Sequence, residues 1–135
     1  MLGRLLGIDY GDVRIGVAIS DPLGLTAQPV GTIQNSKNAI SEIVKIILEK
    51  KVEKCIIGLP KNQHGDDSLK AASVRAFVEQ LQAAHPIEVE LVDERFSTVA
   101  VTRVLNDLNI RGAKRKAVID TQAAMYILQG VLDRK

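Results

Sequence analysis

Two short apolar runs separated by a polar turn open the chain and limit what it can fold into. The first run, Leu5 to Ile8, is apolar on both faces, which is typical of a strand at the centre of a sheet. The second, Arg14 to Ser20, alternates large apolar side chains with Gly, Ala and Ser. Asp9 and Gly11 interrupt the pattern between the two runs. We therefore expect a tight hairpin that places the carboxylate of Asp9 at the end of a strand.

The rest of the chain predicts helices that alternate with strands. Residues 28–33 read as a third short strand, and Asn35 or Ser36 can cap the helix that follows and ends near Lys50 and Lys51. The remaining expected elements are, in order, an apolar strand at 54–60, a polar loop at 61–68, a helix at 69–84, a strand at 87–92, a helix that begins at Ser97 or Thr98, a basic connection at 111–116 and a last helix from about Asp120.

This order, β-β-β-α-β-α-β-α-α, defines the expected fold class. Strands joined by short turns pair antiparallel, whereas strands separated by helices pair parallel. We therefore expect an α/β protein in which residues 1–135 form a single domain: a mixed five-stranded sheet with helices on both faces. That order of elements is the order of the ribonuclease H-like fold.

Composition excludes several classes of protein. The chain is 46% hydrophobic and 25% charged, and its apolar runs are far shorter than the roughly 20 residues that cross a bilayer, so we expect no membrane association. The first residues show no signal-peptide pattern, which favours the cytoplasm. The single cysteine, Cys55, lies in an apolar run and predicts a buried thiol, with no disulfide and no redox chemistry.

Basic residues gather in one segment although the net charge is only +2. The sequence RGAKRK, at 111–116, contains no acid and is either a solvated loop or a contact for phosphates. Tyr10 could stack on a base or pack in the core. Arginine suits bidentate contacts to phosphate and lysine acts as a point charge, so the candidate nucleic-acid contacts are Arg14, Arg95, Arg111, Lys114, Arg115 and Lys116.

Acidic residues fall at three expected element ends: Asp9, the pair Asp93 and Glu94, and Asp120. Each could have a structural role alone, as a turn residue, a surface ion-pair partner or a helix N-cap. In a mixed sheet, however, the carboxyl ends of the parallel strands lie side by side at one edge. Carboxylates that converge there repel one another unless a cation neutralises them, and oxygen ligands favour Mg²⁺ or Mn²⁺. Such a site can support phosphodiester cleavage.

The geometry of strands and helices refines this predicted metal site. Asp93 and Glu94 face opposite sides of a regular strand, so at most one can reach the same ion. Glu94 is longer and stands at the very end of the strand, and Asp93 remains the alternative ligand. Ala123 and Ala124 lie one turn beyond Asp120, and such small side chains would let the last helix approach the sheet and carry Asp120 toward the first strand.

Four motifs in this order and spacing resemble the YqgF (RuvX) family of bacterial ribonuclease H-like proteins: GIDYGDVRIGVAISD, IIGLPKNQHG, VDERFST and DTQAAMYILQGVLD. The resemblance covers nearly the whole chain. It implies a cytoplasmic, metal-dependent nuclease that matures the 5′ end of 16S ribosomal RNA from its precursor. The alternatives are a Holliday junction resolvase and a non-catalytic nucleic-acid-binding module. By motif, the acids of the family fall on Asp9, on the pair Asp93 and Glu94 with Glu94 preferred, and on Asp120.

One position departs from the related resolvases, which carry a further carboxylate at the end of the fourth strand. Here that strand ends in Gly58-Leu59-Pro60, so we expect an incomplete four-ligand site and weak or partner-dependent activity. The expected partner is a nucleic acid, with precursor rRNA favoured over branched DNA. The sequence is compatible with a monomer and with a homodimer.

Overall fold

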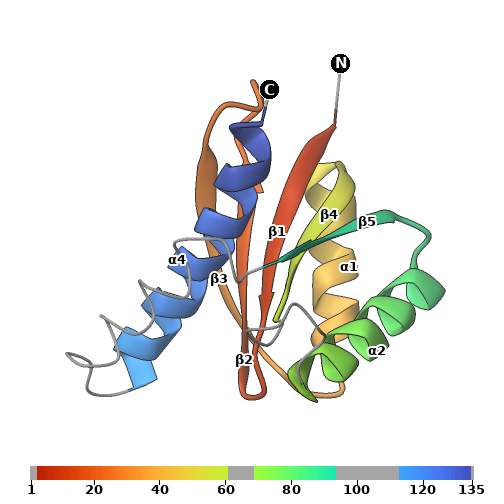
Figure 1. Cartoon of the computed structure of the whole chain (residues 1–135). Helices are drawn as coiled ribbons and strands as arrows, with labels where there is room; N and C mark the ends of the chain where they lie inside the picture. Colours follow the sequence, from red (N-terminus) through yellow and green to blue (C-terminus); the bar gives the residue numbers. More distant parts are fainter. Residues whose placement is uncertain (1–2, 61–68, 94–112, 135) are drawn as a thin grey trace.

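A mixed five-stranded sheet lies between two helical layers in the computed structural model, which describes residues 3–60, 69–93 and 113–134 (Figure 1). The order across the sheet is β3-β2-β1-β4-β5. β2 pairs antiparallel with both of its neighbours, and β4 pairs parallel with both of its own. The elements are β1 (Arg4–Tyr10), β2 (Arg14–Ser20), β3 (Ala27–Gln34), α1 (Ala39–Lys50), β4 (Val52–Leu59), α2 (Leu69–Ala84), β5 (Glu88–Asp93) and α4 (Ala113–Leu132).

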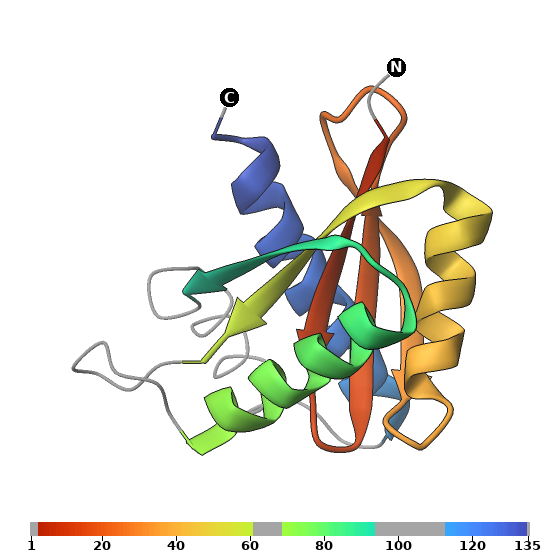
Figure 2. The ribbon, with the colours of Figure 1, turned by 90° about the vertical axis from the view of Figure 1, so that its right-hand side faces the viewer.

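Helices cover both faces of the sheet, as the element order predicted. Figure 2 shows α1 and α2 in front of the sheet and α4 behind it. Because side chains alternate along a strand, β1 contributes Leu6 and Ile8 to the core beneath α1 and α2. The intervening residues Leu5, Gly7 and Asp9 therefore lie on the side of α4. Among the described residues, no helix is long and apolar enough to cross a membrane.

Two glycines of the central strands allow α4 to approach the sheet very closely. A β-carbon on Gly7 would lie 2.8 Å from the carbonyl oxygen of Ala124, and one on Gly16 would lie 2.0 Å from the carbonyl oxygen of Asp120. Ala123 and Ala124 are buried in this contact, with 3% and 0% of their surface exposed. The close approach expected from the two alanines is therefore present, and the strand glycines make it possible.

The start of α4 differs from its expected position. The helix begins at Ala113, so most of the basic segment 111–116 is helical, and Asp120 lies inside the helix. The interpretation of Asp120 as an N-cap is therefore wrong. The physical reason lies in residues 113–117, which are Ala, Lys and Arg only, among the strongest helix formers. Because the helix already exists one turn before Asp120, its side chain does not cap a helix end.

Two other boundaries also differ from the sequence-based expectation. β1 continues through Asp9 to Tyr10, because Asp9 pairs with Gly16 in the ladder to β2. α1 begins only after Asn38, whose side chain makes no cap hydrogen bond. Asn35 does not cap α1, since its side-chain amide donates to the carbonyl oxygen of Gly11 at 2.8 Å and so holds the β1–β2 turn. The expected loop at 61–68 and the helix expected from Ser97 or Thr98 lie outside the described residues.

Cys55 is buried in the core beneath α1 and α2, as expected for a cysteine in an apolar strand. None of its surface is exposed, and burial raises the pKa of its thiol to about 12. The thiol is therefore protonated at neutral pH and behaves as a small apolar side chain.

Candidate active site

A pocket of about 220 Å³ lies where the parallel strands β1 and β4 end, and it contains two of the predicted acids. We call it the carboxylate pocket. This edge of the sheet is where open α/β folds place their ligands. Its lining residues are Asp9, Tyr10, Gly11, Asp12, Val13, Arg14, Gly58, Pro60, Lys70 and Asp120.

Asp9 reaches the carboxylate pocket from inside the sheet. Only 3% of its surface is exposed, and Asp9 and Ser20 are the two buried polar or charged residues among those described. The side chain lies on the α4 side of β1, opposite Gly16 of β2, where a larger neighbour would fill the space. A carboxylate so far from water is stable only with hydrogen bonds or a cation beside it. Its burial is therefore more consistent with a site than with a surface turn.

Asp120 enters the same pocket from α4 and forms an ion pair with Arg14. The Nε of Arg14 donates to Oδ2 of Asp120 at 3.0 Å, and the two side chains are 19% and 22% exposed. Arg14 begins β2, and the seating of α4 on Gly16 brings the Asp120 backbone over the same strand. The sequence predicted Arg14 as a phosphate contact, whereas in this structure its guanidinium is paired with an acid of the site.

Lys70 and Asp12 form a second, exposed charge pair at the rim of the carboxylate pocket. The Nζ of Lys70 lies 3.7 Å from Oδ2 of Asp12, and both side chains are about 70% exposed, at 69% and 70%. Such a pair is weak because water screens it. Neither residue was among the site residues predicted from the sequence. Asp12 was visible in the motif DYGD, but nothing near Lys70 distinguished it from other surface lysines.

Tyr10 lines the carboxylate pocket and also packs against α2. Its ring centroid lies 4.8 Å from that of Phe77, with the planes tilted by 43°. The packing role that the sequence left open for Tyr10 is therefore present in the fold.

Asp93 lies on the other side of the sheet from Asp9. It pairs with Leu59 at the end of β4, and Leu59 belongs to the core beneath α1 and α2. Of the other predicted site residues, Glu94, Arg95 and Arg111 lie outside the described residues, as do the side chains of Lys114, Arg115 and Lys116.

The carboxylate oxygens in the carboxylate pocket are suitable ligands for a hard cation. Its described titratable side chains comprise three carboxylates, two cations and the phenol of Tyr10, with no His or Cys. Mg²⁺ keeps several waters and commonly binds through one or two carboxylates together with substrate phosphates. Asp9 and Asp120 fit that pattern, although the residues described here include no group of three or more His, Cys, Asp or Glu side chains around one point.

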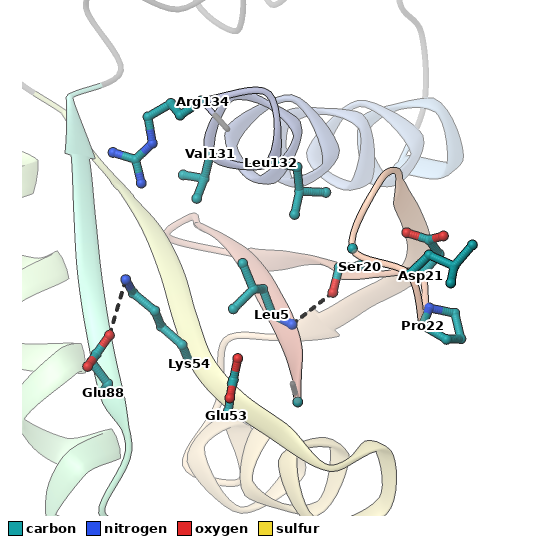
Figure 3. Close-up of a pocket in the computed structure, with 13 residues that line it drawn as sticks. Leu5, Ser20, Asp21, Pro22, Glu53, Lys54, Glu88, Val131, Leu132 and Arg134 are labelled. Atoms are coloured by element: carbon teal, nitrogen blue, oxygen red, sulfur yellow. Dashed lines mark hydrogen bonds and ion pairs between the residues drawn. The ribbon is translucent and has the colours of Figure 1, made fainter. Parts of the chain in front are cut away.

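A larger pocket, of about 540 Å³, lies at the opposite end of the sheet (Figure 3). It is formed by the start of β1, β4 and β5, the end of β2 and the end of α4, and contains none of the predicted site residues. Lys54 pairs there with Glu88 at 3.1 Å and with Glu90 at 2.9 Å, and Arg134 pairs with Glu90 at 2.7 Å. The hydrogen bond to Glu90 is the largest cause that raises the pKa of Lys54, and the bond from Lys54 likewise lowers the pKa of Glu90. Lys54, Glu88, Glu90 and Arg134 thus pair with one another and require no ligand. The larger volume of this pocket is therefore not evidence that it is the active site.

Two solved junction resolvases share this arrangement of elements. The chain superimposes with a TM-score of 0.62 on "T. thermophilus RuvC in complex with Holliday junction substrate", at 11% identity and with 98% of this chain and 96% of that chain covered. The fowlpox virus resolvase in complex with Holliday junction DNA gives a TM-score of 0.56 at 10% identity, with 97% of each chain covered. At such identities the likeness shows the fold. Sheet order and helical layers thus define a ribonuclease H-like fold of the RuvC type.

Sequence comparison assigns the family within that class. The chain belongs to the RuvX family, whose model, described as "Holliday junction resolvase", matches residues 3–134. A Clostridioides difficile protein named "Putative pre-16S rRNA nuclease" is 49% identical over 135 residues, which cover 98% of this chain and 96% of the relative. A Clostridium novyi protein of the same name is 46% identical over 132 residues, with 96% and 98% covered.

Proposed function

We propose that this protein is a nuclease that hydrolyses phosphodiester bonds at the 5′ end of precursor 16S rRNA. One observation carries the catalytic part of the proposal: two carboxylates distant in sequence, Asp9 and Asp120, line one pocket at the carboxyl end of the parallel strands. The names of the 49% and 46% identical relatives support the choice of substrate.

Asp9 and Asp120 would hold a Mg²⁺ or Mn²⁺ ion. When bound there, a divalent cation supplies an activated water and stabilises the leaving oxygen of the phosphodiester. The residues themselves provide the negative charge: Asp9 from a buried, fixed position in β1, and Asp120 from a helix seated directly on the sheet. We propose Glu94, the neighbouring acid in the motif VDERFST, as a third ligand, because Asp93 lies on the face of the sheet away from Asp9.

Basic side chains would bind the phosphates that flank the reacting group. Lys70 is exposed at the rim of the carboxylate pocket, where a phosphate backbone can reach it. We propose the same role for the other basic residues that were predicted from the sequence to contact phosphates. These are Arg95 and Arg111, which lie outside the described residues, and Lys114, Arg115 and Lys116 at the start of α4. Gly58 and Pro60 line the pocket without adding a carboxylate, which is consistent with a modest cleavage rate.

A four-way DNA junction is the second candidate substrate, favoured by the description of the matching family model. A junction resolvase makes paired cuts and is expected to act as a two-fold symmetric dimer. Precursor rRNA processing makes no such demand. The mass in solution and the cleavage pattern therefore separate the two candidates.

The proposal is tested by cleavage of a 5′-extended 16S rRNA fragment and of a synthetic four-way junction, each with Mg²⁺, Mn²⁺ or EDTA. We expect the wild type to cut the rRNA fragment in either metal and not in EDTA, and Asp9→Asn and Asp120→Asn to lower the rate by at least about 100-fold. Asp133→Asn is the matched control, because Asp133 follows the C-terminal end of α4, is exposed and does not line the carboxylate pocket. Cleavage that survives both substitutions would overturn the proposal, and tight RNA binding without cleavage, indifferent to Mg²⁺, would favour a non-catalytic binding module.

A further inference from the structure

We propose that Arg14 is a built-in counter-ion of the carboxylate pocket, which competes with the divalent cation for Asp120 and thereby lowers the metal affinity of the site. The inference rests on the proposed metal-dependent function and adds a residue that regulates it. Arg14 is a positioning residue in this account, since it acts on the reaction through Asp120.

The ion pair is short and partly shielded from water. Arg14 Nε and Asp120 Oδ2 lie 3.0 Å apart, and about four fifths of each side chain is covered, with 19% and 22% exposed. A charge-assisted hydrogen bond at this distance is stronger than a neutral one, and reduced exposure weakens its screening by solvent. The exposed pair of Lys70 and Asp12 in the same pocket, 3.7 Å apart, has neither property.

The fold itself brings Arg14 and Asp120 together. Gly16, two residues after Arg14, lies directly beneath the Asp120 backbone, where a β-carbon would be 2.0 Å from its carbonyl oxygen. The contact that places Asp120 in the pocket therefore also places it beside Arg14. Because both residues are fixed by the seating of α4 on β2, the pairing does not depend on a freely moving surface side chain.

The charge balance of the pocket shows what the pairing does to a cation. Its described lining contains three acids, Asp9, Asp12 and Asp120, and two bases, Arg14 and Lys70, which leaves a net charge of −1. Without Arg14 the same lining carries −2, which matches a divalent ion. Arg14 thus neutralises one of the proposed ligands, Asp120, and repels an incoming cation.

This arrangement implies an exchange of partners when the site becomes loaded. With a cation bound, Asp120 would be one of the residues that hold it, and the guanidinium of Arg14 would be available to a phosphate oxygen in the same pocket. Arginine is suited to both partners because its planar fork matches carboxylate and phosphate. The phosphate role that the sequence predicted for Arg14 would then follow the arrival of metal.

The test measures Mn²⁺ binding to the whole protein without nucleic acid, by calorimetric titration and by the loss of the free-ion signal in electron paramagnetic resonance. We expect Arg14→Gln to tighten Mn²⁺ binding roughly tenfold, since a hydrogen-bonded charge partner of Asp120 is removed. Arg14→Lys keeps the positive charge with a different geometry, so its Mn²⁺ affinity should lie between those of the wild type and Arg14→Gln. Lys70→Gln removes the same charge from the same pocket without touching Asp120, and should change the affinity by less than about twofold.

Thermal unfolding gives a second readout, independent of activity. In EDTA, Arg14→Gln should melt at a lower temperature than the wild type, because Asp120 loses its ion-pair partner. Saturating Mn²⁺ should raise the melting temperature of Arg14→Gln by more than it raises that of the wild type. If Arg14→Gln does not fold, Arg14→Lys decides the question with the same two measurements.

The outcomes separate this inference from the proposed function. Equal or weaker Mn²⁺ binding by Arg14→Gln, together with loss of binding in Asp9→Asn, would overturn the counter-ion role and leave the metal site standing. Weaker binding would show that Arg14 instead orients Asp120 for the ion. Absence of Mn²⁺ binding in the wild type and every variant would overturn the metal-dependent function and this inference together.

Discussion

The carbonyl oxygen of Asp120 occupies the space above Gly16 that a side chain would otherwise fill, 2.0 Å from the position of an added β-carbon. One residue of β2 thus sets how closely α4 approaches the sheet. Since Asp120 belongs to the carboxylate pocket, this backbone contact links the packing of a strand glycine to the geometry of the proposed active site.

Gly16→Ala should therefore destabilise the protein and impair cleavage at the same time. The added methyl group meets backbone, which cannot rotate away, so we expect a loss of about 3 kcal/mol in the free energy of unfolding, at the upper end of the usual cost of overpacking. Denaturant unfolding followed by circular dichroism measures it. The matched control is Gly130→Ala in α4, where an added β-carbon meets nothing within 4 Å, and a gain of about 0.5–1 kcal/mol is expected from helix propensity. Similar effects of the two substitutions would contradict the close contact.

Lys70→Gln should weaken nucleic-acid binding in a salt-dependent way. If Lys70 contacts one phosphate, the slope of log affinity against log salt should become shallower by roughly 1. Fluorescence anisotropy with a labelled rRNA fragment, titrated from low to high salt, measures the slope. Lys45→Gln is the control, because Lys45 is 74% exposed on α1, which contributes no residue to the carboxylate pocket. An unchanged slope for Lys70→Gln would place the phosphate backbone elsewhere.

Glu90→Gln should lower stability at neutral pH and have little effect in acid. Its bonds to Lys54 and Arg134 lower the pKa of Glu90 below its ordinary value of 4.5. A lowered pKa in the folded state means that the stabilisation is complete above pH 4.5 and is lost as the pH falls through the folded value. We expect a difference of roughly 0.5–1 kcal/mol from the wild type at pH 7, discounted because the group is partly exposed, and convergence in acid.

Unfolding curves collected at several pH values test this prediction for Glu90. Glu49→Gln serves as the control, because its pair with Lys45 is 4.0 Å long and largely exposed, with 61% of the Glu49 side chain and 74% of the Lys45 side chain in contact with solvent. A constant difference between Glu90→Gln and the wild type from neutral to acid pH would show that the charge of Glu90 does not stabilise the fold.

The thiol of Cys55 should be unreactive in the native protein. Burial raises its pKa to about 12, and none of its surface is exposed, so at pH 8 the thiolate is scarce and inaccessible. A thiol-reactive chromogenic disulfide should label no cysteine in native buffer and one per chain in denaturant, in agreement with the single Cys of the sequence. Rapid native labelling would mean that the centre of β4 opens readily.

The fold could be predicted from sequence because its signals are local and strong. The apolar runs at Leu5 to Ile8 and Arg14 to Ser20 indicate strands without reference to the rest of the chain, and the helix at 69–84 was predicted with its observed bounds. Of the boundaries that failed, the start of α4 follows from local helix propensity at 113–117, whereas the cap expected for α1 was lost to a distant contact. Asn35 was an acceptable cap by its residue type, but its partner Gly11 lies 24 positions away.

Two of the three described acids that line the carboxylate pocket were predicted from the sequence, whereas the ion pair of Asp120 was not. Motif spacing pointed to Asp9 and Asp120, which the fold brings to one pocket. The ion pair of Arg14 with Asp120 joins residues 106 positions apart and depends on how α4 is seated. That packing of α4 depends on Gly7 and Gly16, and in the sequence nothing distinguishes these two glycines from other small strand residues. The consequence of a missing side chain appears only when a second element occupies its space.

The close contacts of α4 with Gly7 and Gly16 also fix the position of the helix along its own axis. Ala124 and Asp120 are four residues apart, about one helical turn, and each rests its carbonyl on a different glycine. Because α4 is held at both glycines, it cannot shift along its axis by part of a turn without a steric clash with β1 or β2. The solvent-facing residues of α4 can therefore be substituted, and the outer surface of the protein changed, without moving Asp120.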